Sequence, residues 1–306
     1  MSSPSRPGAR RRARSPIPAT GPTALAVLAA RLRCPNCAGS LVPADRALAC
    51  ARGHRFDLAR QGHVALLAPR RKRAAGDAAD MVVSRETFLR AGHYAPIAAA
   101  VQAAARPIAA RTADAAPSVV DLGASTGYYL AALLRELRAW WGVALDASAP
   151  ALRRAVRAHP RIAAIACDVW QPLPIQDAAA RLVVNVFAPR NGPEIARVLS
   201  PDGALIVVTP TPRHLHQLVP VLGMLGVAPD KRARVHATLS ARFEAVDHRA
   251  VAFDMTLTHQ DVLALVAMGP SAHHVETAAV RRHLARLPAA IRVTASVDVE
   301  TFRRRA

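Results

Sequence analysis

Lysine is almost missing from this sequence: Lys72 and Lys231 are the only two lysines among 306 residues. Lys plus Arg nevertheless number 41 against 21 Asp plus Glu, which gives a formal charge of +20. So large a cationic excess favours an anionic partner such as nucleic acid or a membrane surface. The chain is also crowded with Ala, Arg and Pro, so biased codon usage is a second source of arginine. A polyanionic substrate is the interpretation that we favour.

Long apolar runs and internal repeats are missing as well. No apolar run approaches the roughly 18 residues that a membrane-spanning helix needs, which argues against a membrane protein. The basic stretch 6–14 and the apolar stretch 24–30 imitate a short signal peptide, but Arg31 and Arg33 lead directly into a cysteine motif that has to stay intact. We therefore predict a disordered basic tail over residues 1–22.

Four cysteines are too few for a disulfide scaffold in a chain of this length, and three of them lie within 17 residues. This spacing suits metal binding in a reducing cytoplasm. Cys34 and Cys37 form a C-x2-C pair, and Cys50 and His54 form a C-x3-H pair twelve residues later. Two close pairs joined by a loop predict a tetrahedral Cys3His site for Zn²⁺ with a structural role, because four protein ligands leave no open position. Free thiols and a surface histidine are the alternative.

A zinc-binding domain over residues 23–69 and a basic linker over residues 70–80 are predicted to precede the main domain, residues 81–306. The apolar positions within 55–69 indicate a small sheet that closes over the metal. The four cations Arg70–Arg73 come before a Gly/Ala/Asp turn. For this run both a solvated linker and a phosphate-contacting segment are open, since a basic run can gain affinity by counterion release.

The most informative motif lies at residues 119–129. A β-branched run ends at Asp121, glycines follow at Gly123 and Gly127, and a helical pattern begins at Leu130. A strand that passes into a helix through such a turn is typical of a site for a nucleotide-like ligand, because glycines can adopt positive φ and let backbone amides face the ligand. The dinucleotide fingerprint G-x-G-x-x-G is absent. An ordinary turn is the alternative.

The spacing D-x-G-x-x-x-G resembles motif I of the S-adenosylmethionine-dependent methyltransferases, with Ser125 in place of the middle glycine. A serine there has to keep a negative φ or accept strain. Asp146 ends the next predicted strand, 25 residues after Asp121, where a carboxylate can accept both ribose hydroxyls of an adenosine. Asp168 follows the third strand and could receive the adenine amino group, with a helix cap as the alternative.

Strands and helices alternate through the main domain, which predicts a mainly parallel sheet covered on both faces, with a late antiparallel strand. A turn is expected at 201–203 and a helix opening after Pro212. The further predicted strands cover residues 141–146, 162–167, 181–186, 204–209, 243–247, 251–257 and 291–299. The predicted helices cover residues 81–89, 94–105, 130–138, 149–159, 194–199, 259–268 and 278–287. The fold class is therefore α/β.

Five segments, spread over about residues 30 to 300, are together typical of one family. They are the two cysteine-containing pairs followed by Phe-Asp, and residues 91–94, 126–129, 187–191 and 209–215. In this combination the chain resembles the bacterial 23S rRNA guanine-N1-methyltransferases, including the type that protects tylosin-producing actinomycetes. The resemblance implies a Rossmann-like, seven-stranded S-adenosylmethionine-dependent methyltransferase domain with a small N-terminal zinc-binding domain.

The same resemblance implies S-adenosylmethionine and Zn²⁺ as cofactors and a 23S rRNA hairpin as the partner. It assigns cofactor contacts to Tyr94 and His214 beside Thr126 and Gly127, although Tyr94 taken alone is also typical of a core aromatic residue. Such enzymes are often homodimers, and the tylosin-resistance branch acts on a guanine in hairpin 35 and thereby gives macrolide resistance. We expect a cytoplasmic protein without a membrane partner.

Guanine N1 carries a proton, so methylation needs a base or a group that stabilises the enolate-like anion. The candidates are Asp168 as the base, Asn185 as a partner for the base edge and Arg190 to hold negative charge on O6. Two other functions stay open: a non-catalytic zinc-ribbon RNA-binding protein, and a small-molecule methyltransferase. A zinc ribbon and a basic linker are poorly explained by a small neutral substrate.

Overall fold

The computed structural model describes residues 23–67 and 76–305 of the chain. The predicted tail over residues 1–22 and the basic run Arg70–Arg73 therefore lie outside the described residues. Within the two described ranges, no helix combines the length and the apolar character that crossing a bilayer requires.

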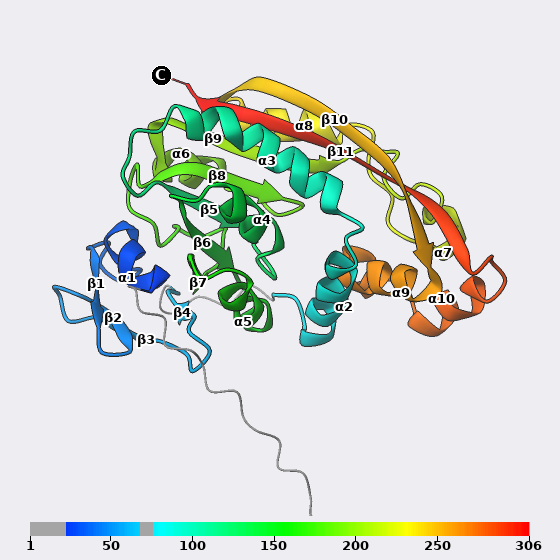
Figure 1. Cartoon of the computed structure of the whole chain (residues 1–306), viewed down its shortest axis with the longest axis horizontal. Helices are drawn as coiled ribbons and strands as arrows, with labels where there is room; N and C mark the ends of the chain where they lie inside the picture. The colour runs from blue at the N-terminus through cyan, green and yellow to red at the C-terminus, as the bar shows by residue number, and fades with distance from the viewer. Residues whose placement is uncertain (1–22, 68–75, 306) are drawn as a thin grey trace, which may run out of the picture.

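An eight-stranded sheet with the order β10-β11-β9-β8-β5-β6-β7-β4 forms the centre of the molecule (Figure 1). Strands β4 to β9 run parallel to one another, whereas β11 is antiparallel to both β9 and β10. The strands are Val64–Ala65 (β4), Ser118–Leu122 (β5), Trp141–Asp146 (β6), Ile162–Ala166 (β7), Ala180–Val186 (β8), Leu199–Pro210 (β9), Phe243–Thr258 (β10) and Ala290–Arg304 (β11). The predicted α/β class and its seven strands, β5 to β11, are confirmed, and β4 adds an eighth strand.

Successive residues of the central strands enter two separate hydrophobic cores. In β5, Val119 belongs to one core, and Val120 and Leu122 belong to the other. Because neighbouring residues of a strand face opposite sides of the sheet, both faces need a cover of helices. Helices α3, α4 and α5 cover the first face, and α1, α6 and α8 cover the second. Their bounds are Ala24–Leu28 (α1), Ala95–Ala110 (α3), Tyr128–Glu136 (α4), Ala149–Ala158 (α5), Gly192–Val198 (α6) and Lys231–Leu239 (α8).

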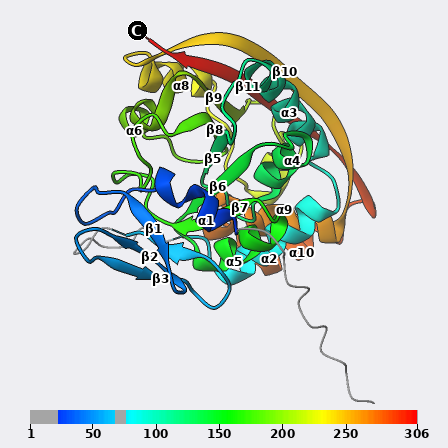
Figure 2. The same ribbon diagram turned by 60° about the vertical axis from the view of Figure 1, so that its left-hand side comes forward.

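The N-terminal segment forms a three-stranded antiparallel sheet beside the large one (Figure 2). Its strands are Leu41–Ala44 (β1), Ala47–Cys50 (β2) and Arg55–Asp57 (β3). Leu28 and Leu32 are fully buried in the core on the second face of the large sheet, and Val64 pairs with Ile165 of β7. The prediction of one small sheet within 55–69 is therefore only partly right, since β3 lies in the small sheet but β4 extends the large one.

Three more helices gather near the far end of the long β10–β11 hairpin (Figure 1). They are Ala79–Arg90 (α2), His259–Met268 (α9) and Thr277–Leu284 (α10). Helix α2 packs against α9 and also approaches α5. It follows the described segment 76–78 and leads into α3.

Some predicted boundaries are wrong. The turn expected at 201–203 lies inside β9, at a point where the pairing with β8 is interrupted. The strands expected at 243–247 and 251–257 are one continuous β10 that carries an irregularity near its start. The chain after Pro212 forms a series of turns before the short helix α7, Val219–Leu222.

Leu28→Ala should destabilise the whole chain and not only the zinc-binding part, because Leu28 is fully buried in a core that both parts share. The expected loss is about 2–5 kcal/mol of the free energy of unfolding. Denaturant unfolding followed by circular dichroism and by zinc release measures it, with the exposed Leu225→Ala as the control. Zinc release in a separate, earlier transition with an unchanged main transition would contradict the shared core.

Candidate active site and metal centre

The loop between β5 and α4 lies where the strand order reverses, with β6 on one side of β5 and β8 on the other. Gly123 and Gly127 have positive φ values of 70° and 75°. A Cβ on Gly123 would lie 2.6 Å from the Cβ of Ala188, and one on Gly127 would lie 3.0 Å from the Cα of Ala155. Conformation and space therefore both require glycine at these positions. Open α/β sheets bind ligands outside the strand ends at such a reversal.

The carboxylate of Asp146, at the end of β6, holds two turns in place. Its Oδ2 accepts a hydrogen bond from the amide of Ser125 at 2.8 Å, and its Oδ1 accepts one from the amide of Ser148 at 2.7 Å. Ser125 has a φ of 48°, so this serine adopts the strained left-handed conformation that the missing glycine would adopt freely. Each carboxylate oxygen keeps a further lone pair, which is compatible with the predicted role toward ribose hydroxyls.

Two buried polar groups beside the loop lack partners within the described part of the chain. Asp121 is 2% exposed, and burial, with a contribution from the charge of Asp146, raises its pKa to about 7. No hydrogen bond to its carboxylate is present among the described residues. The hydroxyl of Tyr129 interacts electrostatically with Asp121 and is also without a hydrogen-bond partner there. Buried polar groups are normally paired, so these groups fit a ligand that carries its own cation and polar atoms, as S-adenosylmethionine does.

Tyr94 and His214 come together although 120 residues separate them, with 3.1 Å between Tyr94 Oη and His214 Nε2. His214 Nδ1 accepts a hydrogen bond from the amide of Ser296 at 3.1 Å, so we assign the ring proton to Nε2, which donates to Tyr94. Burial lowers the pKa of His214 to about 4, and the ring is therefore neutral at pH 7. Phe187, with a φ of 54° and 41% exposed, lies near both rings.

Tyr94 is a core aromatic residue whose hydroxyl also reaches His214, and its contact with the cofactor stays a prediction. Its ring is buried and packs edge-on against Phe88, as a core aromatic residue does, while its hydroxyl reaches His214. Burial raises the pKa of Tyr94, so the hydroxyl stays protonated. Thr126 is also buried, within the glycine loop.

Of the three predicted catalytic residues, Asp168 lies after β7, Asn185 lies near the end of β8 and Arg190 lies in the loop after β8, and each is engaged by its own neighbours. The carboxylate of Asp168 accepts a hydrogen bond from the amide of Trp170 at 3.0 Å, in the manner of a turn cap. Asn185 is fully buried; its Nδ2 donates to the carbonyl of Pro189 at 2.8 Å, and its Oδ1 accepts from Arg190 at 3.1 Å. Asn185 thus shapes the loop after β8 and holds Arg190, whose pKa is lowered by burial.

The four predicted zinc ligands form one cluster, with all ligand atoms within 4.8 Å of one another. The Sγ atoms of Cys37 and Cys50 are 3.7 Å apart, and His54 Nδ1 lies 3.6 Å from Cys34 Sγ and 3.3 Å from Cys50 Sγ. A zinc tetrahedron has S···S edges of about 3.8 Å and S···N edges of about 3.6 Å, given Zn–S near 2.3 Å and Zn–N near 2.0–2.1 Å. The cluster therefore fits Zn²⁺, with His54 binding through Nδ1.

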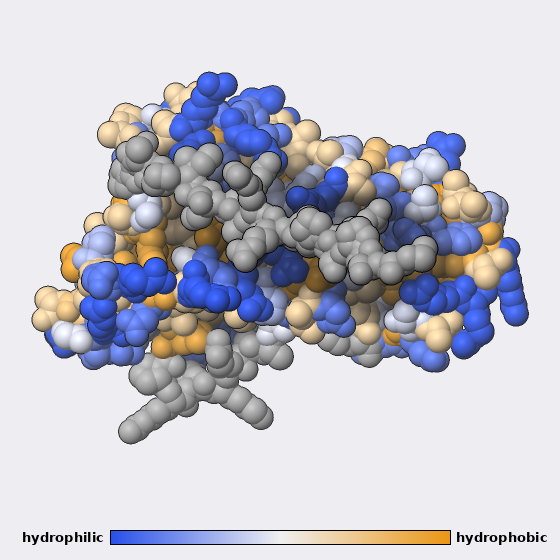
Figure 3. All heavy atoms as spheres, turned by 60° about the horizontal axis from the view of Figure 1, so that its bottom comes forward, coloured by the Kyte–Doolittle hydropathy of each residue, from blue (hydrophilic) through white to orange (hydrophobic). Residues whose placement is uncertain are grey.

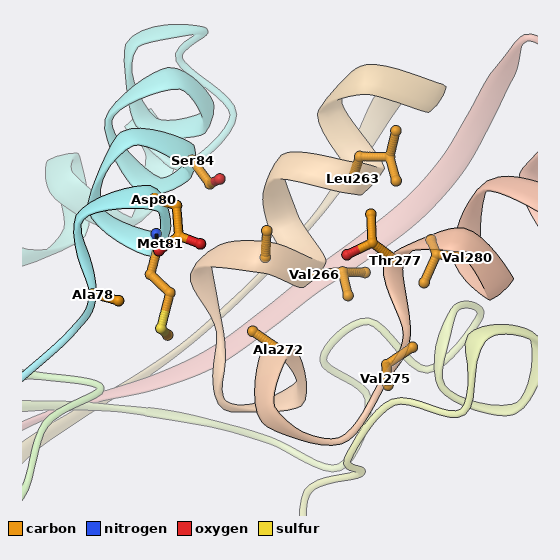
Figure 4. Close-up of a pocket in the computed structure, with 11 residues that line it drawn as sticks. Ala78, Asp80, Met81, Ser84, Leu263, Val266, Ala272, Val275, Thr277 and Val280 are labelled. Atoms are coloured by element: carbon orange, nitrogen blue, oxygen red, sulfur yellow. Dashed lines mark hydrogen bonds between the residues drawn. The ribbon is translucent and has the colours of Figure 1, made fainter.

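A cavity of about 260 Å³ lies between α2, α9, the short helix Pro270–His273 (η2) and α10 (Figure 4). Its lining is mainly apolar, with Met81 on one side and Val280 on the other and the polar groups of Asp80, Ser84 and Thr277 among them. None of the predicted site residues lines this cavity, so it is separate from the candidate site.

Two residues of the candidate site were not predicted. Arg85 donates to the hydroxyl of Ser125 at 2.6 Å, and no local pattern indicates this because the two positions are 40 residues apart. Phe187 belongs to a segment that carried the family resemblance, but its unusual φ and its exposure could not be inferred from the sequence. The contact of Arg85 with the loop and the position of Phe187 beside Tyr94 and His214 are properties of the folded chain.

Comparisons with known proteins agree with this geometry. The sequence model of a zinc-ribbon family, described as "RlmA, N-terminal", matches residues 32–75. Over 286 residues the chain is 49% identical to a putative 23S rRNA (guanine-N(1)-)-methyltransferase of Micromonospora griseorubida, which covers 89% of this chain and 97% of that relative. Over 272 residues it is 46% identical to the 23S rRNA (guanine(748)-N(1))-methyltransferase of Streptomyces fradiae, with 89% of this chain and 96% of that relative covered.

Cys50→Ser should reduce the zinc content from about one ion per chain to about a tenth of that or less, because a hydroxyl is a poor replacement for a thiolate ligand. The melting temperature of the whole chain should fall as well, since Cys50 also belongs to the shared core. Elemental analysis and thermal unfolding measure the two effects. Cys167→Ala, which removes the thiol outside the cluster, is the control and should keep its zinc.

The affinity for S-adenosylhomocysteine, which carries an ammonium group, should rise about tenfold between pH 6 and pH 8, because Asp121 with a pKa of about 7 ionises over that range. Asp121→Asn should remove this dependence, and Asp247→Asn, on the edge strand β10, should keep it. Calorimetric titration at the two pH values measures the affinity.

Without ligand, the raised pKa of Asp121 has the opposite effect on folding. The native state retains a proton that the unfolded state releases, so the free energy of unfolding should fall from about pH 4 to about pH 7.

Proposed function

This chain belongs to the bacterial 23S rRNA (guanine-N1-)-methyltransferases, and we propose that it transfers a methyl group from S-adenosylmethionine to N1 of one guanine in a hairpin of 23S rRNA. The family and enzyme class predicted from the sequence are confirmed. The observation that carries the proposal is the combination, in one chain, of a glycine loop at the strand-order reversal and a Cys3His cluster that shares a hydrophobic core with the same sheet.

The residues around the loop support S-adenosylmethionine as the methyl donor. Asp121 and Asp146 place carboxyl groups beside the glycine loop, and the hydroxyl of Tyr129 is unpaired within the described residues. When bound, the cofactor supplies an activated methyl group on a sulfonium. The chain then has to position the two reactants in line and to manage one proton of the guanine.

Aromatic side chains around the candidate site support a nucleobase substrate. The ring of Phe187 is partly exposed and lies next to Tyr94 and His214. The side chain of Trp170, in the segment that follows β7, is 59% exposed. Exposed aromatic side chains stack readily on unpaired RNA bases. Arg190 is held by Asn185, and its remaining N–H groups suit the negative charge that develops on guanine O6 when N1 loses its proton. We assign the general base to Asp168.

A hairpin in 23S rRNA, with hairpin 35 as the specific site, is the partner that we propose. Hydrophilic residues occur in several groups on the face of the molecule in Figure 3, interrupted by hydrophobic ones. With a formal charge of +20, the chain is suited to a polyanion. Cytoplasmic location, macrolide resistance of the tylosin type and a homodimer are further parts of this proposal, and they rest on the resemblance to the family.

Two other functions make different predictions for one experiment. A non-catalytic RNA-binding protein would bind the hairpin without methylating it. A small-molecule methyltransferase would bind the cofactor and leave the RNA unmodified. Methylation of a hairpin transcript with labelled S-adenosylmethionine, followed by primer extension to locate the modified base, separates both from the proposed function.

Arg190→Ala should lower kcat about 10²–10⁴-fold in this assay if Arg190 holds the charge of the deprotonated guanine. Asp168→Asn should cause a loss of similar size at neutral pH, and a smaller loss at higher pH, where guanine N1 ionises without a base. Arg249→Ala, on the edge strand β10, is the matched control for Arg190. Full methyl transfer by Asp168→Asn would remove Asp168 as the base.

A further inference from the structure

Arg85 joins three segments that are distant in the sequence. Its Nη1 donates to the carboxylate of Asp77, which lies before α2, and to the hydroxyl of Ser125 in the glycine loop at 2.6 Å. Its Nη2 donates to the carbonyl of Met268 at the end of α9. The Arg85 side chain is 21% exposed, so these contacts form at a largely enclosed place.

Ser125 is the residue that most needs such support. A non-glycine residue at a φ of 48° is strained, and such a conformation persists only where the surroundings fix it. The amide of Ser125 is bound by Asp146 and its hydroxyl by Arg85. The two contacts hold the residue from its backbone and from its side chain.

The segment that contains Asp77 lies directly on the second turn of the site. A Cβ on Gly76 would lie 2.5 Å from the amide nitrogen of Ser148, and the hydroxyl of Ser148 donates to the carbonyl of Asp77 at 2.7 Å. Helix α2 is fixed to α5 by an ion pair of 2.9 Å between Glu86 and Arg154. The chain that follows the zinc-binding part is therefore packed on both turns that Asp146 holds.

Charge explains why an arginine suits this place. Asp77 and Asp146 are close enough that, after burial, the charge of Asp77 raises the pKa of Asp146, whereas Arg85 opposes this rise. Without the guanidinium, two carboxylates would repel each other across the turn that carries Ser125.

We propose that Arg85 is a positioning residue for the cofactor loop: it holds Ser125 in the left-handed conformation and ties the loop to the segment that follows the zinc-binding part of the chain. This role rests on the proposed cofactor site. Arg85 does not take part in methyl transfer itself. A glycine at position 125 would adopt the left-handed conformation without help, whereas Ser125 needs the contact with the Arg85 side chain to keep it.

Calorimetric titration of the full chain with S-adenosylhomocysteine tests the role by a double-mutant cycle. Arg85→Ala should weaken binding about tenfold or more when residue 125 is serine, and by less than about threefold in the Ser125→Gly background, because glycine adopts positive φ without help. Ser125→Ala keeps the strain but loses the contact, so it should bind more weakly than Ser125→Gly. Equal losses from Arg85→Ala in both backgrounds would overturn the proposal.

Arg90→Ala is the matched control, because Arg90 lies on the same helix and its side chain is 79% exposed. The affinity of this variant for S-adenosylhomocysteine should equal that of the wild type. In the methylation assay, Arg85→Ala should raise KM for the cofactor while kcat at saturating cofactor stays within about twofold. Arg85→Lys keeps the charge but loses the planar set of guanidinium N–H donors, so its KM for the cofactor should lie between those of the wild type and Arg85→Ala. Failure of the wild type to bind the ligand would refute the proposed function, whereas wild-type binding with an unaffected Arg85→Ala would refute only the role of Arg85.

Discussion

The buried carboxyl group of Asp121 and the half-buried one of Asp146 lie close together at the ends of β5 and β6, and the surrounding loops have to accommodate both. Burial raises the pKa of both Asp121 and Asp146, since an ionised carboxylate loses its hydration there. The amides of Ser125 and Ser148 compensate Asp146. No comparable donor reaches Asp121 among the described residues, and the folded site is therefore short of positive charge. A cationic ligand is the partner that such a site favours.

The zinc-binding part of the chain does not pack as an independent domain. Leu28 and Leu32 are buried in the same core as residues of β5 and β6, and β4 extends the large sheet beside β7. Cys34 and Cys50 lie in this core as well, so the metal cluster and the sheet stabilise each other. A module with three short strands has little core of its own, and this packing explains how it keeps a fixed position relative to the catalytic sheet.

The regular elements could be predicted because their signals are local. The strand 141–146 and the helix 259–268 match the structure at both ends, and C-x2-C with C-x3-H predicted the cluster. The contacts of Arg85 with Ser125 and Met268 could not be predicted, because they join residues 40 and 183 positions apart. The contacts of Asn185 are local, but the sequence does not show that its own loop occupies both the nitrogen and the oxygen of its side-chain amide. Spacing indicates which residue types meet at a strand end, but not which of them remain free for a ligand.

The distribution of charge across the strand ends follows the demands of the proposed reaction. On the side of β5 and β6 lie the carboxyl groups of Asp121 and Asp146, whose pKa values are raised by burial. On the side of β8, burial lowers the pKa of Lys231, and the nearby charges of Arg190 and Arg234 lower it further. A cationic methyl donor is therefore favoured at one side and an anionic RNA at the other. The glycine loop lies between these two sides, so the proposed transfer of a methyl group from the cofactor to the RNA takes place beside this loop.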